Sequence, residues 1–331
     1  PVTAHVRAAD SVWPQDPAFS HALAAGITTV LVLPGSANLV GGQGVTLKLH
    51  PGRSVADMQF PGAPPTLKMA CGENPKRVYR NSGPSTRMGN MAGYRAAFID
   101  AEEYRKKWDA YNKDRKGDPP SRDLQLETLA GVLRGDILVH NHCYRADEMA
   151  QIIDLSKEFG FKVRSFHHAV EGYKIADLLA KEGIAASVWA DWCCFKMESF
   201  DAVPQNAALL QKAGTRTIIH SDDAIGIQRL NQEAAKAMYA GQQVGIPISR
   251  EEAIKWITIN PAWALGIDSV TGSLEAGKAA DVVLWSGDPF SIYSKAEQVY
   301  NDGWLVYDRN DPNRQPQTDF NLGLTAPGVG Q

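Results

Sequence analysis

Three apolar stretches of this chain each end in side chains that can bind a metal ion. They are 137–142 (Ile-Leu-Val-His-Asn-His), 163–168 (Val-Arg-Ser-Phe-His-His) and 218–223 (Ile-Ile-His-Ser-Asp-Asp). Each indicates a β-strand that presents histidine or aspartate at its C-terminal end, where barrel enzymes keep their catalytic residues. Imidazole nitrogens and a carboxylate oxygen suit a dication such as Zn²⁺, which can keep one position open for water. The sequence therefore predicts a metal centre at three strand ends.

Strands and helices alternate around these stretches. In the second half of the chain we expect strands at 137–142, 162–167, 184–189 and 216–221, and helices at 146–159, 173–181, 204–212 and 229–240. In the first half we expect helices at 18–25 and 91–113, and strands at 27–33, 45–49 and 66–70. Ser249 and Glu252 form a capping box that opens a helix at 254–259. Strand–helix repeats of roughly 25 residues favour an α/β fold, a (β/α)₈ TIM-type barrel.

The composition of the chain changes after Leu265. A tight turn at 272–281 precedes a strand, and Asp302-Gly303 is typical of a β-hairpin. We therefore expect a barrel at 1–264, a small β appendage at 265–310 and an extended tail at 311–331, which is rich in glycine, proline and polar residues.

Composition and charge exclude several classes of partner. The 331 residues are 44% hydrophobic and carry a formal charge of −3, so we expect neither nucleic acid nor membrane as a partner. The longest apolar run, 27–33, is far too short to span a bilayer. We expect a small-molecule substrate and a homo-oligomer. The chain opens at Pro1 without an initiator methionine, so we expect a fragment of a longer product, and its location in the cell stays open.

The four cysteines do not form a recognisable framework. Cys193 and Cys194 are adjacent, Cys71 and Cys143 stand alone, and no CxxC spacing occurs. We expect free, mostly buried thiols without a catalytic or metal-binding role.

Short motifs near the end of the predicted barrel are the most specific part of the chain. They are 258–262 (Thr-Ile-Asn-Pro-Ala), 265–267 (Leu-Gly-Ile) and 272–281 (Gly-Ser-Leu-Glu-Ala-Gly-Lys-Ala-Ala-Asp), with 25–30 (Ala-Gly-Ile-Thr-Thr-Val) near the start. In this order they resemble the amidohydrolase superfamily, in its imidazolonepropionase-like branch, over nearly the whole chain to about residue 308. The resemblance implies a metal-dependent hydrolase barrel with a small β-sandwich built from both chain ends.

The resemblance also implies a set of metal ligands. His142 corresponds to the fifth-strand ligand because 145–148 (Arg-Ala-Asp-Glu) continues as in the branch, and His140 is its competitor. His168 corresponds to the sixth-strand ligand and Asp222 to the eighth-strand carboxylate. Successive side chains of a strand face opposite sides, so we expect one residue of each adjacent pair to face away.

The fourth-strand ligand has two candidates. Lys68 matches the position where many members carry a carboxylated lysine that bridges two metal ions, whereas Glu73 could bind a metal directly. The family's first strand ends in a His-x-His pair, and no such pair stands near the start of this sequence, so we expect that strand to precede Pro1. The resemblance implies a divalent metal, Zn²⁺, as one or two ions.

The implied reaction is hydrolysis of a C–N bond in an amide, a cyclic amide or a peptide. Asp222 would accept a proton from the activated water and pass it to the leaving nitrogen. Substrate contacts are expected from Tyr144, Glu171 and Arg87, with 36–43 and Trp192 nearby. Two alternatives remain open. One is a ring deaminase with Glu171 as proton shuttle, and the other is an inactive barrel that serves as scaffold or binder.

Overall fold

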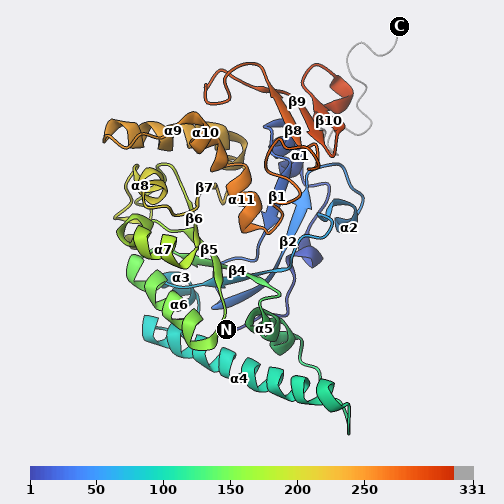
Figure 1. The fold of residues 1–331 in the computed structure, drawn as a ribbon, viewed down its shortest axis with the longest axis vertical. Coiled ribbons are helices and arrows are strands. Elements are labelled where there is room, and N and C mark those ends of the chain that lie inside the picture. Colours follow the sequence, from blue (N-terminus) through green and yellow to red (C-terminus); the bar gives the residue numbers. More distant parts are fainter. Residues whose placement is uncertain (317–331) are drawn as a thin grey trace.

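A seven-stranded sheet forms the centre of the computed structural model, which describes residues 1–316 (Figure 1). In spatial order its strands are β1 (Thr29–Val32), β2 (Val40–Lys48), β3 (Thr66–Ala70), β4 (Leu138–Cys143), β5 (Val163–His168), β6 (Ala185–Val188) and β7 (Thr217–Ile219). Strands β3 to β7 pair in parallel, whereas β1 to β3 pair antiparallel. The predicted α/β fold is confirmed, but a closed eight-stranded barrel is not, because the described sheet ends at β1 and β7.

A helix follows each of the strands β4 to β7, and these helices lie along one side of the sheet (Figure 1). They are α6 (Ala146–Phe159), α7 (Ala176–Glu182) after the short η2 (Gly172–Ile175), α8 (Asn206–Lys212) after η3 (Met197–Ser199), and α9 (Leu230–Gln243) after η4 (Gly226–Arg229). Helix α6 ends at Gly160, whose φ of 74° is the left-handed conformation that glycine adopts at little cost. The predicted α/β alternation is therefore present from β4 onward.

The remaining helices connect or cover the sheet. They are η1 (Ala8–Ser11), α1 (Pro17–Ala24), α2 (Val55–Met58), α3 (Glu73–Val78), α4 (Arg87–Asp114), α5 (Leu124–Arg134), α10 (Arg250–Lys255), α11 (Ile259–Ala264) and η5 (Pro312–Arg314). None of the helices in residues 1–316 combines the length and the apolar character needed to cross a membrane. The prediction of a helix at 254–259 is wrong in its bounds. The capping box of Ser249 and Glu252 starts α10 directly at Arg250, and a second helix follows.

The main hydrophobic core fills the space between the sheet and its helices. Strands contribute alternating apolar side chains, as Leu67 and Met69 do on β3, and α6 contributes Ile152 and Leu155, all fully buried. Burial of this apolar surface is the main force that holds the strand ends in register. The rigid core thus positions the polar residues at the strand ends.

A three-stranded antiparallel sheet forms the small β unit, at the top of Figure 1. Its strands are β8 (Val282–Trp285), β9 (Ala296–Asn301) and β10 (Trp304–Asp308), in the order β10-β9-β8. Asp302 and Gly303 both have positive φ (51° and 80°), as a two-residue hairpin turn requires, so the predicted hairpin is confirmed. The unit packs on α1 and β2, but a two-sheet sandwich is not confirmed. The domain boundaries stay predictions, and most of the expected tail, 317–331, lies outside the described residues.

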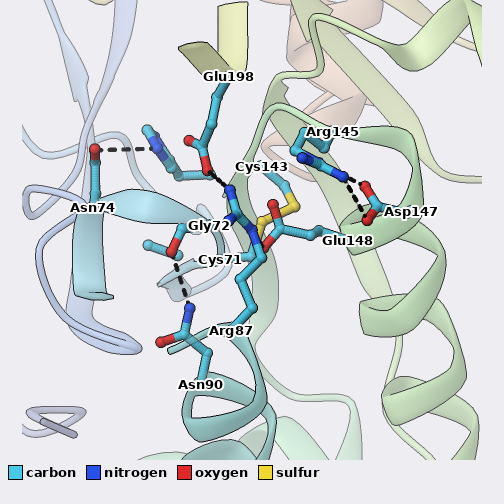
Figure 2. The surroundings of a disulfide bond; sticks show 12 residues. Cys71, Gly72, Asn74, Arg87, Asn90, Cys143, Arg145, Asp147, Glu148 and Glu198 are labelled. Carbon is cyan, nitrogen blue, oxygen red and sulfur yellow. Dashed lines mark hydrogen bonds and ion pairs between the residues drawn. A yellow bond between two sulfur atoms is a disulfide. The ribbon is translucent and has the colours of Figure 1, made fainter. Parts of the chain in front are cut away.

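All four cysteines are paired, so the prediction of free thiols is wrong. Cys71 bonds to Cys143, and Cys193 bonds to Cys194. Cys71 follows β3 and Cys143 ends β4. Their preceding residues are partners in the parallel pairing of these strands, which brings the two Cα atoms to 5.2 Å (Figure 2). Sequence spacing does not show this pairing because the two cysteines are 72 residues apart.

Candidate active site

Buried and half-buried histidines gather at the C-terminal ends of β4, β5 and β7. On β4, His140 and His142 are two residues apart and therefore face the same side. Nδ1 of His140 lies 2.9 Å from Nε2 of His167, and the rings of His142 and His168 have centroids 4.5 Å apart. The structure thus brings together two of the predicted ligands, His142 and His168, and places the competitor His140 in the adjoining pair.

Two of the predicted ligands have left-handed backbone conformations. His168 has a φ of 72° and Asp222 a φ of 58°, in the left-handed region that few non-glycine residues adopt. The turn at His168 breaks the strand alternation, so both His167 and His168 face the cluster. Their rings lie 5.9 and 5.1 Å from that of His220. The expectation that one residue of this pair faces away is therefore wrong.

The carboxylate of Asp222 is free to reach the histidines, whereas that of Asp223 is not. Oδ2 of Asp222 lies 3.9 Å from Nε2 of His168, and the Asp222 side chain is 60% exposed. Oδ2 of Asp223 instead accepts hydrogen bonds from the backbone N–H groups of Ile225 and Gly226. Of the two carboxylates, only that of Asp222 therefore points to the histidine cluster without a backbone partner among the described residues.

Burial keeps the clustered imidazoles neutral. It lowers the pKa of His142 and His168 well below the usual value, and nearby Lys68 lowers both further. It also lowers the pKa of His140 and of His220 to about 3. Neutral imidazole carries the lone pair that a metal ligand needs. Among the described residues, Nδ1 of His142 and Nδ1 of His168 are buried without a hydrogen-bond partner.

Lys68 belongs to the histidine cluster. It lies on β3 beside its pairing partner His140 and is 5% exposed. Burial lowers the pKa of its ammonium group, and the charge of Asp222 opposes that effect. Within residues 1–316 its Nζ has no hydrogen bond or ion pair. Glu73 begins α3, and its backbone N–H donates to Oε1 of Glu198 at 2.6 Å. Of the two fourth-strand candidates, Lys68 is thus the one that the strand pairing places directly beside a histidine of the cluster.

Tyr144 is the predicted substrate contact that the structure places at the cluster. Its buried ring stacks on that of His168, with centroids 5.1 Å apart and planes at 24°. Burial and nearby carboxylates raise the pKa of its hydroxyl group. Tyr144 therefore stays a protonated donor at neutral pH.

The two charged substrate candidates already have protein partners. Arg87 lies between two buried carboxylates, 3.1 Å from Glu148 and 2.9 Å from Glu198, beside the Cys71–Cys143 disulfide (Figure 2). Glu171 accepts a hydrogen bond from the N–H of Ala146, at the start of α6, and pairs with Lys174. These contacts give Arg87 and Glu171 structural roles, and their contacts with substrate stay predictions.

Sequence reasoning missed a polar link to His142. Nδ2 of Asn74 lies 3.2 Å from Nε2 of His142, and its Oδ1 accepts a hydrogen bond from Lys196 at 3.3 Å. Asn74 therefore contacts the ring edge of His142 that carries Nε2. Asn74 stands beside Glu73 in the sequence, but its distance of 68 residues from His142 hides the contact.

The donor set fits a dication in chemistry but not as a complete shell. Two neutral imidazoles and a carboxylate are available, and two buried ring nitrogens have no partner among the described residues. In that same part of the chain, however, no three His, Cys, Asp or Glu side chains are arranged so that they could hold a metal ion. The predicted convergence of His142, His168 and Asp222 on one point is therefore not seen. What the structure shows is their proximity.

Comparison with known proteins assigns the chain to a family of hydrolases. A family model described as the amidohydrolase family matches residues 139–307, which include the strand ends of the histidine cluster. The crystal structure of an amidohydrolase from Thermotoga maritima MSB8 is 40% identical, with a TM-score of 0.86 over 93% of this chain and 79% of that one. The chain belongs to the amidohydrolase family. The predicted superfamily is thereby confirmed, whereas its imidazolonepropionase-like branch stays a prediction.

Curated amidohydrolase relatives are longer than this chain. Amidohydrolase tasK of Hapsidospora irregularis is 33% identical over 93% of this chain and 33% of its own length. An N-substituted formamide deformylase of Arthrobacter pascens is 30% identical over 40% of this chain and 27% of its own length. The chain thus spans about a third or less of each of these two relatives.

Proposed function

We propose that this protein is a metal-dependent amidohydrolase that hydrolyses a C–N bond of a small amide, cyclic amide or peptide-like substrate. One observation carries the proposal. Neutral His142 and His168 lie side by side, the free carboxylate of Asp222 lies 3.9 Å from His168, and two of these three residues have left-handed backbones. Such pre-formed, strained arrangements of titratable groups are typical of catalytic sites.

The proposed roles follow from chemistry and position. His142, His168 and Asp222 would hold one or two divalent ions, Zn²⁺ in our proposal, with a carboxylated Lys68 as a further ligand. When bound, such an ion lowers the pKa of water and polarises a carbonyl group. Asp222 would take a proton from the attacking water and return it to the leaving nitrogen.

The relatives guide the choice of substrate class. The Arthrobacter pascens relative is named for an N-substituted formamide, so secondary amides are the first compounds to screen. The deaminase alternative needs Glu171 as a proton shuttle, and the contacts of Glu171 with Ala146 and Lys174 do not favour it. The inactive scaffold is not favoured either, since His142, His168 and Asp222 lie close together. The expected homo-oligomer stays a prediction.

Matched asparagine variants test the proposal. Asp222→Asn should lower amide hydrolysis about 10²–10⁴-fold, because an amide cannot accept the proton. It should also lower the Zn²⁺ content, measured by elemental analysis after dialysis. Asp223→Asn is the control, since its side-chain oxygen can still accept from the N–H of Ile225. Loss of activity in Asp223→Asn with full activity in Asp222→Asn would show that the ligand is the neighbouring residue. Zinc binding and hydrolysis that are both absent in the parent protein would refute the proposed function.

A further inference from the structure

The segment between β6 and α8 carries an unusual number of exposed apolar side chains next to the histidine cluster. We call residues 189–200 the aromatic loop. Its large side chains are Trp189, Trp192, Phe195, Met197 and Phe200. Four of the five are more than half exposed, and only Trp189 is not. A soluble protein seldom gathers such surface in one loop without a binding role.

Trp189 joins this loop to the catalytic residues. Its ring stacks on His220 with centroids 5.3 Å apart and planes at 12°, and its centroid lies 4.6 Å from that of His168. Its Nε1 donates a hydrogen bond to the backbone oxygen of Ser221 at 2.8 Å. Trp189 is therefore fixed between the proposed metal ligands and the rest of the loop.

Trp192 and Phe195 extend the wall that Trp189 begins. Their ring centroids lie 5.4 and 5.8 Å from that of Trp189 and 6.0 Å from each other. Trp192 is 52% exposed and Phe195 is 56% exposed. A cavity of about 50 Å³ lies between His168 and Trp192. The wall thus runs from the buried histidines to solvent and leaves ring surface free at its outer end.

Hydrogen bonds and a disulfide hold the aromatic loop in place. Glu198, on its far side, accepts hydrogen bonds from Arg87 and from the N–H of Glu73, at 2.9 and 2.6 Å. The Cys193–Cys194 disulfide lies between Trp192 and Phe195. Because the loop is tethered, its rings lose little conformational freedom when a ligand binds.

The one lysine within the aromatic loop, Lys196, is paired with a carboxylate. Nζ of Lys196 lies 3.8 Å from the ring centroid of Tyr144 and 3.4 Å from Oε2 of Glu198. The cation of the loop itself is therefore not free to bind an anionic ligand. What the wall offers to a ligand is the faces and edges of aromatic rings, which favour a flat apolar group.

We propose that Trp189, Trp192 and Phe195 form a binding subsite for an aromatic group adjacent to the amide bond of the substrate. This inference rests on the proposed function, since it places the scissile bond at His168 and Asp222. It adds the class of substrate: secondary amides with an aromatic substituent on the acyl or the amine side.

Binding measurements test the subsite separately from catalysis. The probes are N-phenylacetylglycine and N-acetylphenylalanine, with N-acetylglycine as the reference that lacks the ring. Isothermal titration with the full chain should give a Kd for at least one aromatic amide about 10-fold or more below that of the reference, the usual effect of an apolar group in a fitting pocket. In Trp192→Ala/Phe195→Ala the two Kd values should differ less than about 3-fold.

A matched control removes exposed aromatic side chains elsewhere. Tyr293 and Trp304 are 85% and 78% exposed on the small β unit, so Tyr293→Ala/Trp304→Ala should keep the parent preference. Trp192→Phe should keep most of it, because a ring remains. Circular dichroism confirms that each variant is folded.

The outcomes separate the two proposals. Equal binding of all three amides by the parent chain, or an aromatic preference that survives Trp192→Ala/Phe195→Ala, overturns the subsite. Loop-dependent aromatic binding without hydrolysis of any amide in the presence of Zn²⁺ supports the subsite and refutes the proposed function. Hydrolysis of the amides without a preference for the aromatic ones supports the proposed function and refutes the subsite.

Discussion

Two buried lysines on neighbouring strands have opposite surroundings. Lys48 ends β2 beside the small β unit, and its side chain is 4% exposed. Its Nζ lies 3.3 Å from Oδ1 of Asp281 and also pairs with Asp302. Lys68 on β3 is 5% exposed and, among the described residues, has no paired carboxylate. The first region satisfies its buried charge within the protein. Within residues 1–316, the region around Lys68 leaves a buried ammonium group unpaired among neutral histidines. Such an arrangement lowers stability, which indicates a functional role for this region.

Replacing each lysine by methionine should change stability in opposite directions. Lys48→Met leaves Asp281 buried with only neutral hydrogen-bond donors, so unfolding should become easier by about 3–5 kcal/mol. Lys68→Met removes an unpaired buried charge and keeps the volume, so the stability of the metal-free protein should stay equal or rise. Denaturant unfolding after treatment with chelator measures both. An equal loss in the two variants would remove the distinction between the regions.

The metal content adds a second readout to the same pair. Zn²⁺ binding should fall in Lys68→Met and should not change in Lys48→Met, because Lys48 lies beside the small β unit. Zinc analysis at equal protein concentration measures this. Full zinc binding by Lys68→Met would exclude Lys68 as a ligand.

The disulfide at the ends of β3 and β4 should stabilise the fold beside the histidine cluster. Removing the Cys71–Cys143 link with alanines frees a loop of 72 residues in the unfolded chain, so we expect a loss of about 2–4 kcal/mol. Cys193→Ala/Cys194→Ala is the control, since adjacent residues close almost no loop. Denaturant unfolding of the oxidised proteins gives the comparison. A larger loss in the control would mean that chain entropy is not the source of the effect.

Acid should destabilise the protein through the histidine cluster. Burial lowers the pKa of His140 and His220 from 6.5 to about 3. Between these two pH values the unfolded chain binds protons at both histidines and the folded protein does not. Their contribution to stability is full above pH 6.5 and is lost as the pH falls toward 3. Each histidine should contribute about 1.4 kcal/mol per pH unit within that window.

Unfolding measured at pH 7.5, 6 and 5 tests this slope. His140→Gln/His220→Gln should flatten the pH dependence, whereas His5→Gln, at an exposed position, should not. A double variant with the parent slope would assign the acid sensitivity to other groups.

The sequence predicted the features that depend on local patterns. Alternation and glycine stops gave α6 and β3 with their observed bounds, and the polar ends of the strands indicated where histidines and aspartates would gather. These features succeed because periodicity and turn chemistry act over a few residues. The family-specific motifs then led to the superfamily, which the comparisons confirm.

The sequence did not predict features that depend on which segments meet. The Cys71–Cys143 bond follows from the parallel pairing of β3 with β4, and the contact of Asn74 with His142 follows from the same neighbourhood. Alternation also failed at His168, where one left-handed residue turns two successive side chains toward the same cluster. Such contacts arise from tertiary packing, which no local pattern contains.

The left-handed backbone of His168 has a consequence for chemical complementation. Glycine adopts a φ of 72° without strain, so His168→Gly removes the ring while the chain keeps its path. The space that remains is bordered by the rings of Tyr144 and Trp189, which lie 5.1 and 4.6 Å from the imidazole of His168. Free imidazole from solution has the shape of the missing group. At this position a donor that is covalently part of the chain can thus be exchanged for a diffusible one, whose basicity and size the experimenter chooses.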